Sequence, residues 1–316
     1  MEYRKLGNTG ISVSRLCFGL LTLSGLQRGL DVREGVSLLK KALDLGVTFF
    51  DTAVLYETDE VLNRFLRDVR RDSIVIASKS YDYDYESMRK TVMGVLSRLE
   101  TPYIDLFLLH EQESSLTLKG HMEALEYLNK LKENGDLRAT GISTHRVGGV
   151  KGALEYSNLI DIIMTILNFS GLGITDGNRD DMEMAIKDCF SFDIGTIGMK
   201  ILGGGHLLRD INRAFSYVRR LDFIHSFLIG VEDREELEMD IRLINGLISG
   251  DTISVVKGKE RYIEIEPWCT GCGLCVDRCS QGAISIVNYK AEVYKEKCVL
   301  CSYCAQVCPD FSIKVV

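Results

Sequence analysis

The sequence predicts an α/β fold in which a (β/α)8 barrel at residues 1–250 precedes a small cysteine-rich α+β domain at residues 262–316. Two observations support this prediction. Short apolar, β-branched runs alternate with longer amphipathic runs through the first part of the chain, which is the pattern of repeated βα units around a parallel sheet. The last part of the chain instead repeats one cysteine spacing twice. Residues 251–261, a short polar stretch that contains Gly258, are the predicted linker.

The barrel prediction rests on eight strands, each followed by a helical pattern. The expected strands are Arg15–Gly19, Val47–Phe50, Ile74–Ser78, Ile104–Leu109, Ala139–Ile142, Ile162–Ile166, Thr196–Met199 and Ile224–Ile229. Residues Asp31–Leu45 give the clearest helix, with Asp31 as its N-cap and Gly46 directly after its end. Ahead of the first strand, Tyr3–Leu6 and Ile11–Ser14 flank a turn and predict a hairpin that closes the bottom of the barrel.

Size and charge exclude several classes of function. The chain has 316 residues, of which 46% are hydrophobic and 26% are charged, and its net charge is -7. This is the balance of an ordinary globular protein, and no apolar run is long enough to span a bilayer. Because the net charge is acidic and no basic block occurs, we expect neither nucleic acid nor a membrane as a partner. The N-terminus lacks an apolar signal segment, so the cytoplasm is the expected location.

Eight of the ten cysteines fall in two runs with the same spacing, C-x2-C-x2-C-x3-C, offset by 29 residues. The two runs are Cys269, Cys272, Cys275, Cys279 and Cys298, Cys301, Cys304, Cys308. Thiolates this close together suit a cubane iron-sulfur cluster, which three cysteines of one loop and a fourth from elsewhere hold. Zinc is a weaker alternative, because a longer spacer between paired C-x2-C knuckles is typical of zinc sites. A disulfide framework does not suit a chain that lacks an export signal.

The two cysteine runs resemble the two-cluster module of bacterial ferredoxins. In that family the fourth cysteine of each run ligates the other cluster. The resemblance therefore implies two [4Fe-4S] clusters with crossed ligands, which are Cys269, Cys272, Cys275 and Cys308 for one cluster, and Cys298, Cys301, Cys304 and Cys279 for the other. Pro309 follows Cys308, as the family pattern expects, whereas Ser280 follows Cys279.

Polar side chains follow three neighbouring strands of the predicted barrel. Asp51 and Tyr56 follow the second strand, Lys79 follows the third, and His110 follows the fourth. Active sites of eight-stranded βα barrels lie on the loops at the C-terminal ends of the strands, so we expect these four side chains to meet at one rim. An ammonium group beside a tyrosine makes its phenolate more accessible. Lys79 would serve Tyr56 in this way, held in place by Asp51, and His110 would donate a hydrogen bond to a substrate oxygen.

Roughly residues 1–248 resemble the aldo-keto reductases. The matching segments are Tyr3-Arg4-Lys5-Leu6-Gly7, Phe50-Asp51-Thr52-Ala53 with Tyr56, Ser78-Lys79, Asp105-Leu106, Leu109-His110 and Gly141-Ile142-Ser143. The resemblance implies that Tyr56 is the proton donor, that Lys79 and Asp51 tune it, and that His110 orients the substrate. It also implies a nicotinamide cofactor, either NADH or NADPH, that lies across the barrel mouth and exchanges hydride with a small carbonyl substrate.

The expected cofactor contacts depart in part from the pattern of that family. They are Ser143, Thr144, Asn168, Met199, Lys200, Gly230 and Arg234. Thr144 replaces an Asn of the family, and Met199 replaces an aromatic residue that stacks on the nicotinamide. Two carboxylates precede Arg234 and would repel an adenosine 2′-phosphate, which favours NADH unless Arg234 binds that phosphate. Lys200 and the glycine triplet Gly203–Gly205 are further candidates for contact with the cofactor phosphates.

The two predicted domains differ in the number of electrons that they transfer at a time. A nicotinamide transfers two electrons as hydride, whereas a cluster transfers one at a time, and a flavin that converts between these modes is a further candidate cofactor. The sequence therefore predicts an oxidoreductase whose tetrad acts on a carbonyl compound and whose clusters couple to it directly or through a redox protein partner. Two alternatives stay open. One is an electron-transfer protein whose barrel is a scaffold or docking domain, and the other is a domain in which the clusters are purely structural.

Overall fold

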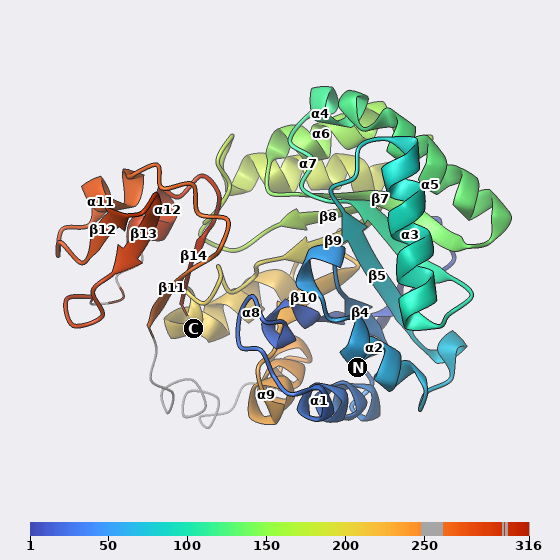
Figure 1. Ribbon diagram of the computed structural model, residues 1–316, viewed down its shortest axis with the longest axis horizontal. Helices are drawn as coiled ribbons and strands as arrows, with labels where there is room; N and C mark the ends of the chain where they lie inside the picture. Colours follow the sequence, from blue (N-terminus) through green and yellow to red (C-terminus); the bar gives the residue numbers. More distant parts are fainter. Residues whose placement is uncertain (248–261, 299, 301–302, 316) are drawn as a thin grey trace.

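The computed structural model describes residues 1–247, 262–298, 300 and 303–315. Eight parallel strands close into a barrel in the order β10-β3-β4-β5-β6-β7-β8-β9 (Figure 1). Their bounds are β3 (Leu16–Gly19), β4 (Phe49–Asp51), β5 (Val75–Ser80), β6 (Ile104–Leu109), β7 (Leu137–Thr144), β8 (Ile162–Ile166), β9 (Gly195–Met199) and β10 (Ser226–Gly230). Each predicted strand overlaps one of these, which confirms the (β/α)8 TIM barrel. The predicted linker, residues 251–261, lies outside the described residues.

Helices surround the barrel and bury their apolar faces against its strands. They are α1 (Val32–Asp44), α2 (Asp59–Leu66), α3 (Tyr85–Leu99), α4 (Ser115–Gly120), α5 (Met122–Asn134), α6 (Val147–Glu155), α7 (Arg179–Ser191), α8 (Ile211–Arg219) and α9 (Arg234–Ile244). The short 3-10 helices are η1 (Leu20–Leu23), η2 (Val54–Tyr56), η3 (Arg71–Ser73) and η4 (Leu208–Asp210). The Asp31 carboxylate accepts a hydrogen bond from the Arg33 amide, so the predicted N-cap of α1 is confirmed. No helix among the described residues is long and apolar enough to cross a membrane.

The inside of the barrel is filled by apolar side chains, and its bottom is closed by the predicted hairpin. Strands β1 (Tyr3–Lys5) and β2 (Ser12–Ser14) pair antiparallel ahead of the barrel. Leu6, Ile11 and Val13 from this hairpin are fully buried in the same interior cluster as residues of the barrel strands. A hairpin that fills the bottom leaves the opposite end, where the strands terminate, as the open face of the barrel.

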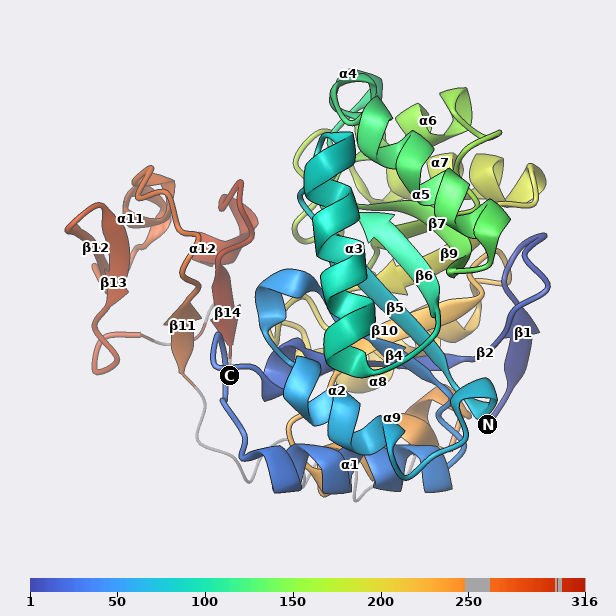
Figure 2. The same cartoon turned by 45° about the vertical axis from the view of Figure 1, so that its right-hand side comes forward.

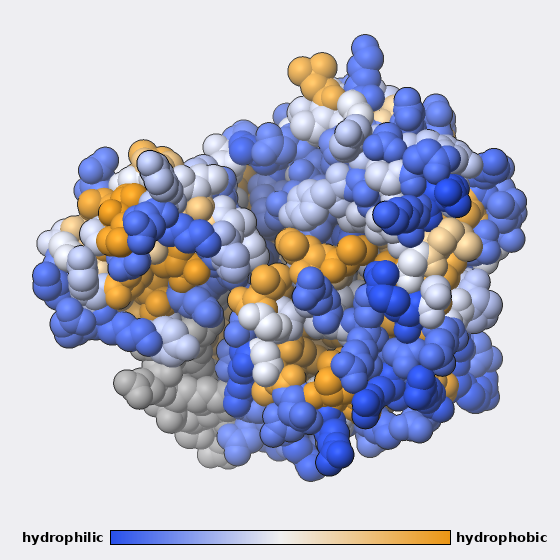
Figure 3. Space-filling view, viewed as in Figure 1, coloured by the Kyte–Doolittle hydropathy of each residue, from blue (hydrophilic) through white to orange (hydrophobic). Residues whose placement is uncertain are grey.

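The C-terminal module, of which the structure describes residues 262–298, 300 and 303–315, lies beside this open face (Figures 1 and 2). Its strands form two antiparallel pairs, β11 (Ile263–Ile265) with β14 (Ile313–Val315), and β12 (Ile284–Val287) with β13 (Lys290–Val293). The short helices α11 (Leu274–Arg278) and α12 (Tyr303–Gln306) complete it. Both views place β14 on the side of the module that faces the barrel, and Figure 3 shows the molecular surface indented between the two parts.

Strand β14 docks on the loop that follows β9. The Val315 amide donates to the Gly204 carbonyl over 2.9 Å, and His206 Nε2 lies 2.9 Å from the Ile313 carbonyl. A Cβ atom on Gly205 would lie 1.9 Å from the Val315 carbonyl oxygen, so only glycine allows this approach. The module is therefore seated on the barrel through contacts to the backbone of β14, and a side chain at position 205 would prevent this approach.

Candidate functional site

The four predicted tetrad residues meet at the open end of the barrel. Asp51 is the last residue of β4, Tyr56 the last of η2, Lys79 lies near the end of β5, and His110 follows β6. Lys79 Nζ donates to Asp51 Oδ1 at 2.7 Å and Oδ2 at 2.8 Å, and to the Thr52 carbonyl at 2.7 Å. The Tyr56 ring centroid lies 5.2 Å from Lys79 Nζ and 6.1 Å from the centre of the His110 ring.

The environment keeps Tyr56 protonated and His110 neutral. Burial raises the pKa of Tyr56 well above its ordinary value, and the Asp51 carboxylate raises it further. Burial likewise lowers the pKa of His110 well below its ordinary value, with Lys79 as the next contribution. Lys79, which we predict to favour the phenolate, donates to Asp51 and Thr52 while its Nζ lies 5.2 Å from the centre of the Tyr56 ring. The site thus holds a phenol that can donate a proton and a neutral imidazole that can donate one hydrogen bond.

One cavity of about 550 Å³ contains the tetrad and extends beneath the C-terminal module. The tetrad lines it together with Tyr81, whose ring stacks on His110 at 4.3 Å between centroids. The module contributes Trp268, Thr270, Pro309, Asp310, Phe311, Lys314 and Val315. Towards α9 the wall is acidic and includes Glu232, Glu236 and Asp240. The cavity is therefore a joint product of the barrel and the module.

Some of the predicted cofactor contacts lie on this cavity and others do not. The lining includes Ser143, Met199, Lys200 and Gly230. Asn168 is fully buried beside it, where Nδ2 donates to the Leu172 carbonyl and Oδ1 accepts from the Leu172 amide, each over 2.9 Å. The Thr144 hydroxyl is likewise buried and accepts from the Arg146 amide over 2.9 Å. Both side chains stabilise their own loops and present nothing to the cavity.

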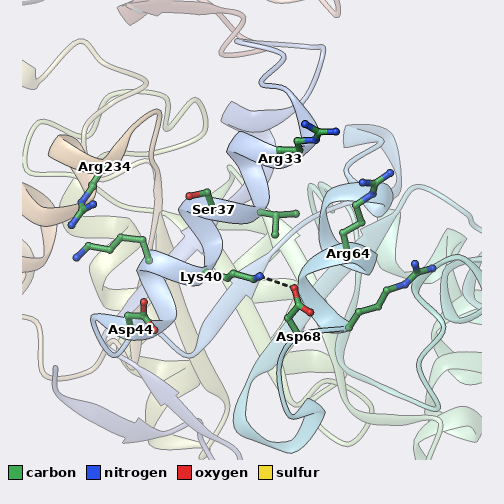
Figure 4. Close-up of a pocket in the computed structure, with 10 residues that line it drawn as sticks. Arg33, Ser37, Lys40, Asp44, Arg64, Asp68 and Arg234 are labelled. Carbon is green, nitrogen blue, oxygen red and sulfur yellow. Dashed lines mark hydrogen bonds and ion pairs between the residues drawn. The ribbon is translucent and has the colours of Figure 1, made fainter.

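Arg234 lies on the outside of the barrel. It lines a surface pocket between α1, α2 and α9, together with Arg33, Ser37, Lys40, Asp44, Arg64 and Asp68 (Figure 4). Its Nε pairs with Glu238 over 3.1 Å, one turn further along α9. Because Arg234 is the first residue of α9 and its side chain pairs with that next turn, it is not brought to the tetrad cavity.

The glycine triplet does permit a close approach, but the approaching group is the protein itself. Gly203, Gly204 and Gly205 all have positive φ, and the Val315 carbonyl occupies the space next to Gly205. Asn168 and Thr144 are thus committed to their loops and β14 covers the triplet, whereas Ser143, Met199, Lys200 and Gly230 remain on the cavity wall.

A second, smaller cavity lies inside the module and is lined by one of the two predicted ligand sets. Its walls include Cys269, Cys272, Cys275 and Cys308. Ser312 donates its amide to Cys308 Sγ over 3.2 Å, as backbone amides do towards cluster thiolates. Four thiols around one space fit a [4Fe-4S] cluster, and they are the crossed set, with Cys308 from the second run. Among the described residues, no group of three or more His, Cys, Asp or Glu side chains lies close enough together to hold a single metal ion.

The other predicted ligand set is described only in part. Cys279, Cys298 and Cys304 lie in the described residues, and Cys301 lies outside them. The Ala283 amide donates to Cys279 Sγ over 3.3 Å, which parallels the contact at Cys308 in the first set. The repeat in sequence is therefore matched by a repeat in local hydrogen bonding. The two cysteines outside both runs, Cys17 and Cys189, are buried in the barrel, where they pack as small apolar residues.

Two residues separate the tetrad cavity from the cysteine cavity. Thr270 and Asp310 line both, and the Thr270 hydroxyl donates to Asp310 Oδ2 over 2.8 Å. Trp268 Nε1 donates to the Asp310 carbonyl over 3.2 Å and also lines the tetrad cavity. Sequence reasoning missed these residues and Phe311. The available signal was their position, since they flank Cys269 and Cys308.

Comparison with known proteins agrees with this architecture. The model of the aldo/keto reductase family matches residues 15–237, and that of the 4Fe-4S dicluster domain matches residues 268–311. A putative aldo-keto reductase from Pseudomonas aeruginosa superimposes with a TM-score of 0.68 at 27% identity, covering 78% of this chain and 95% of that one. The fold is thus shared over nearly the whole of that structure.

Relatives of known sequence cover the barrel in part. L-galactose dehydrogenase of Arabidopsis thaliana is 30% identical over 220 residues, which is 66% of this chain and 67% of that protein. The uncharacterized oxidoreductase YqkF of Bacillus subtilis is 29% identical over 180 residues, 52% of this chain and 56% of its own length. A probable voltage-gated potassium channel subunit beta of Oryza sativa is 28% identical over 53% of this chain and 54% of its own length. These matches span about half to two thirds of the relatives. The chain belongs to the aldo/keto reductase family and carries a 4Fe-4S dicluster domain after its barrel.

Proposed function

We propose that this protein is an oxidoreductase that interconverts a carbonyl compound and its alcohol at the tetrad and exchanges the electrons with two [4Fe-4S] clusters in the C-terminal module. One observation carries the proposal: a single cavity is lined by Asp51, Tyr56, Lys79 and His110 and by the residues that flank Cys269 and Cys308. A barrel that served only as a scaffold would not need this complete tetrad on the wall that it shares with a cluster site.

The tetrad supplies the proton chemistry. Tyr56 is a protonated phenol, and it donates to the carbonyl oxygen as negative charge develops there. His110 is neutral, so one ring nitrogen donates a hydrogen bond to the same oxygen and fixes its position. The ion pair of Lys79 with Asp51 holds the floor of the site rigid, since both side chains are buried and all three ammonium protons have acceptors. Alcohol oxidation reverses these proton movements.

The electrons balance between the two parts of the molecule. Reduction of a carbonyl to an alcohol consumes two electrons and two protons. Tyr56 delivers the proton that reaches oxygen, and the two electrons reach carbon together with the second proton as a hydride, which a carrier recharged by the clusters would supply. Clusters supply electrons singly, and two reduced [4Fe-4S] clusters hold the two that one turnover requires. Three of the residues assigned to the nicotinamide, Thr144, Asn168 and Arg234, do not line the cavity, and the proposal takes the clusters as the source of electrons. A flavin in the cavity is the cofactor that would gather single electrons into a hydride.

The experiment uses full-length protein purified without oxygen, with its clusters intact. The clusters are reduced with dithionite, excess reductant is removed, and a panel of aldehydes and ketones is added while visible absorbance is followed. Reoxidation of the clusters with formation of the alcohol supports the proposal. Tyr56→Phe should slow alcohol formation by about 10²-fold or more, because it removes the proton donor. Unchanged turnover in this variant would favour the scaffold interpretation instead.

Two further measurements identify the electron carrier. Extraction of the protein tests for bound flavin, and the flavin hypothesis fails if the clusters are present and flavin never is, even after reconstitution. Addition of NADH and NADPH in separate experiments tests whether either nucleotide reduces the clusters or supports turnover. A different outcome is turnover with either nucleotide while the clusters stay oxidised throughout. That result would indicate nicotinamide-dependent catalysis with purely structural clusters.

A further inference from the structure

Two lysines from different parts of the chain meet in the tetrad cavity. Lys200 is the first residue after β9, and Lys314 lies in β14 of the module. Their ammonium nitrogens lie 5.3 Å and 3.7 Å from the centre of one aromatic ring, that of Phe311. Lys314 is 4% exposed and donates to the Phe311 carbonyl. Docking of the module therefore places two lysine side chains on one wall of the cavity, which neither part provides alone.

The position of Lys200 is set by an uncommon backbone conformation. Its φ is +59°, in the left-handed region that non-glycine residues rarely adopt. Such conformations persist where the surrounding structure requires them, and they concentrate at functional sites. Here the conformation brings the side chain to the cavity that holds the tetrad, and its charge acts on both Asp51 and His110. The ammonium group is thus near the place where a substrate carbonyl would bind.

The two lysines lack a direct counter-ion among the residues that the structure describes. The carboxylates that act on both through space are Glu266, which is buried, and Glu111, which accepts from the Tyr81 hydroxyl over 2.8 Å. Neither carboxylate forms an ion pair with Lys200 or Lys314. Burial lowers the pKa of both lysines, and Lys200 lowers that of Lys314 further. An anion bound to both lysines would offset the cost of burying their positive charges, because buried charges are stable when paired.

We propose that Lys200 and Lys314 form an oxyanion site and that the carbonyl substrate carries a carboxylate that binds there. This inference rests on the proposed function and narrows its substrate to an anionic carbonyl compound. The carbonyl oxygen would lie at Tyr56 and His110 while the carboxylate lies against the two ammonium groups, so the site would both select and orient the substrate. The acidic end of the cavity, at Glu232 and Glu236, would repel the carboxylate and enforce this orientation.

The test compares two aldehydes of similar shape, para-carboxybenzaldehyde and para-tolualdehyde, on the anaerobic holoprotein. Calorimetry measures binding and alcohol formation measures turnover. We expect the charged aldehyde to bind about tenfold or more tightly than the neutral one, as charge-assisted hydrogen bonds provide. Lys200→Met should remove most of that preference, measured as the ratio of the two affinities. Equal affinities in the wild type, or a preference that survives Lys200→Met, would overturn the inference.

A matched control and two further variants make the result specific. Lys40→Met removes a lysine from the outer basic pocket (Figure 4) and should leave the preference intact. Loss of the preference in that variant would place the anion outside the tetrad cavity and refute the site. Lys314→Met should remove the binding preference as Lys200→Met does. If Lys314→Met detaches the module from the barrel, the result for Lys200→Met decides whether the anion site exists. Tyr56→Phe should retain the binding preference and lose turnover, so failure of the proposed function can be told from failure of the anion site.

Discussion

Replacing Gly205 with alanine should undock the C-terminal module from the barrel. The residue has φ of +87°, and an added Cβ would lie 1.9 Å from the Val315 carbonyl oxygen. That oxygen would have to move by about 1 Å to reach an acceptable contact, and the movement breaks the 2.9 Å hydrogen bond from the Val315 amide to Gly204 and strains the contact at His206. At about 1 kcal/mol for each hydrogen bond, docking weakens by about 2 kcal/mol. The undocked population should then rise about thirtyfold.

Gly135 provides a matched control for this substitution. It has the same φ of +87° but no atom within 4 Å of the Cβ position. Gly135→Ala therefore carries the left-handed backbone strain, about 1 to 2 kcal/mol, without the clash. Hydrogen exchange at the Val315 amide should accelerate in Gly205→Ala and stay at the wild-type rate in Gly135→Ala. Reoxidation of the clusters by a carbonyl substrate should slow in the first variant only. Equal behaviour of the two variants in both assays would refute the docking argument.

Three more predictions concern two buried barrel residues, Asp51 and His225, and the first cysteine set. Asp51→Asn leaves the Lys79 ammonium buried without its counter-charge and should lower the free energy of unfolding by about 3 kcal/mol, measured by denaturant titration. Adding Lys79→Met to this variant should restore most of the lost stability. A double variant whose loss equals the sum of the two single losses would contradict this expectation. Burial lowers the pKa of His225 to about 4, below its unfolded value of 6.5. The contribution of neutral His225 to the free energy of unfolding is therefore complete above pH 6.5 and is lost as pH falls towards 4. The loss should approach about 3 kcal/mol, and His225→Gln should flatten this part of the stability profile. Cys272→Ser and Cys308→Ser should leave the same remaining cluster in electron paramagnetic resonance, whereas different spectra would contradict the crossed ligand set.

The barrel and the tetrad could be predicted because their signals are local and repeat along the chain. Each strand is a short apolar run, and Asp51, Lys79 and His110 follow three successive strands, so the barrel geometry alone brings them to one rim. Tyr56 lies close behind Asp51, on the short helix η2. The cysteine repeat is equally local. These predictions required no knowledge of how distant segments pack.

The cofactor contacts could not be predicted to the same degree, because neighbouring loops decide what each side chain does. Asn168 matches the family by residue type, yet the loop after β8 folds back and uses both ends of its amide. Arg234 has the right charge, but it pairs along the outside of α9 with Glu238. The glycine triplet correctly signalled a close approach, but the approaching strand lies more than a hundred residues later in the chain. Lys314 appears in sequence only as a polar residue in a short strand.

The arrangement of the two ligand sets gives the proposed electron transfer a direction. Residues next to Cys269 and Cys308 line the tetrad cavity, whereas no described neighbour of Cys279, Cys298 or Cys304 does. The first cluster would therefore exchange electrons with the cavity across the thin wall of Thr270 and Asp310, and the second would exchange them with a partner protein. Loss of the first cluster in Cys272→Ser should then abolish reoxidation by the carbonyl substrate while the second cluster still accepts electrons from dithionite. Reoxidation that persists in this variant would show that electrons reach the tetrad by another route.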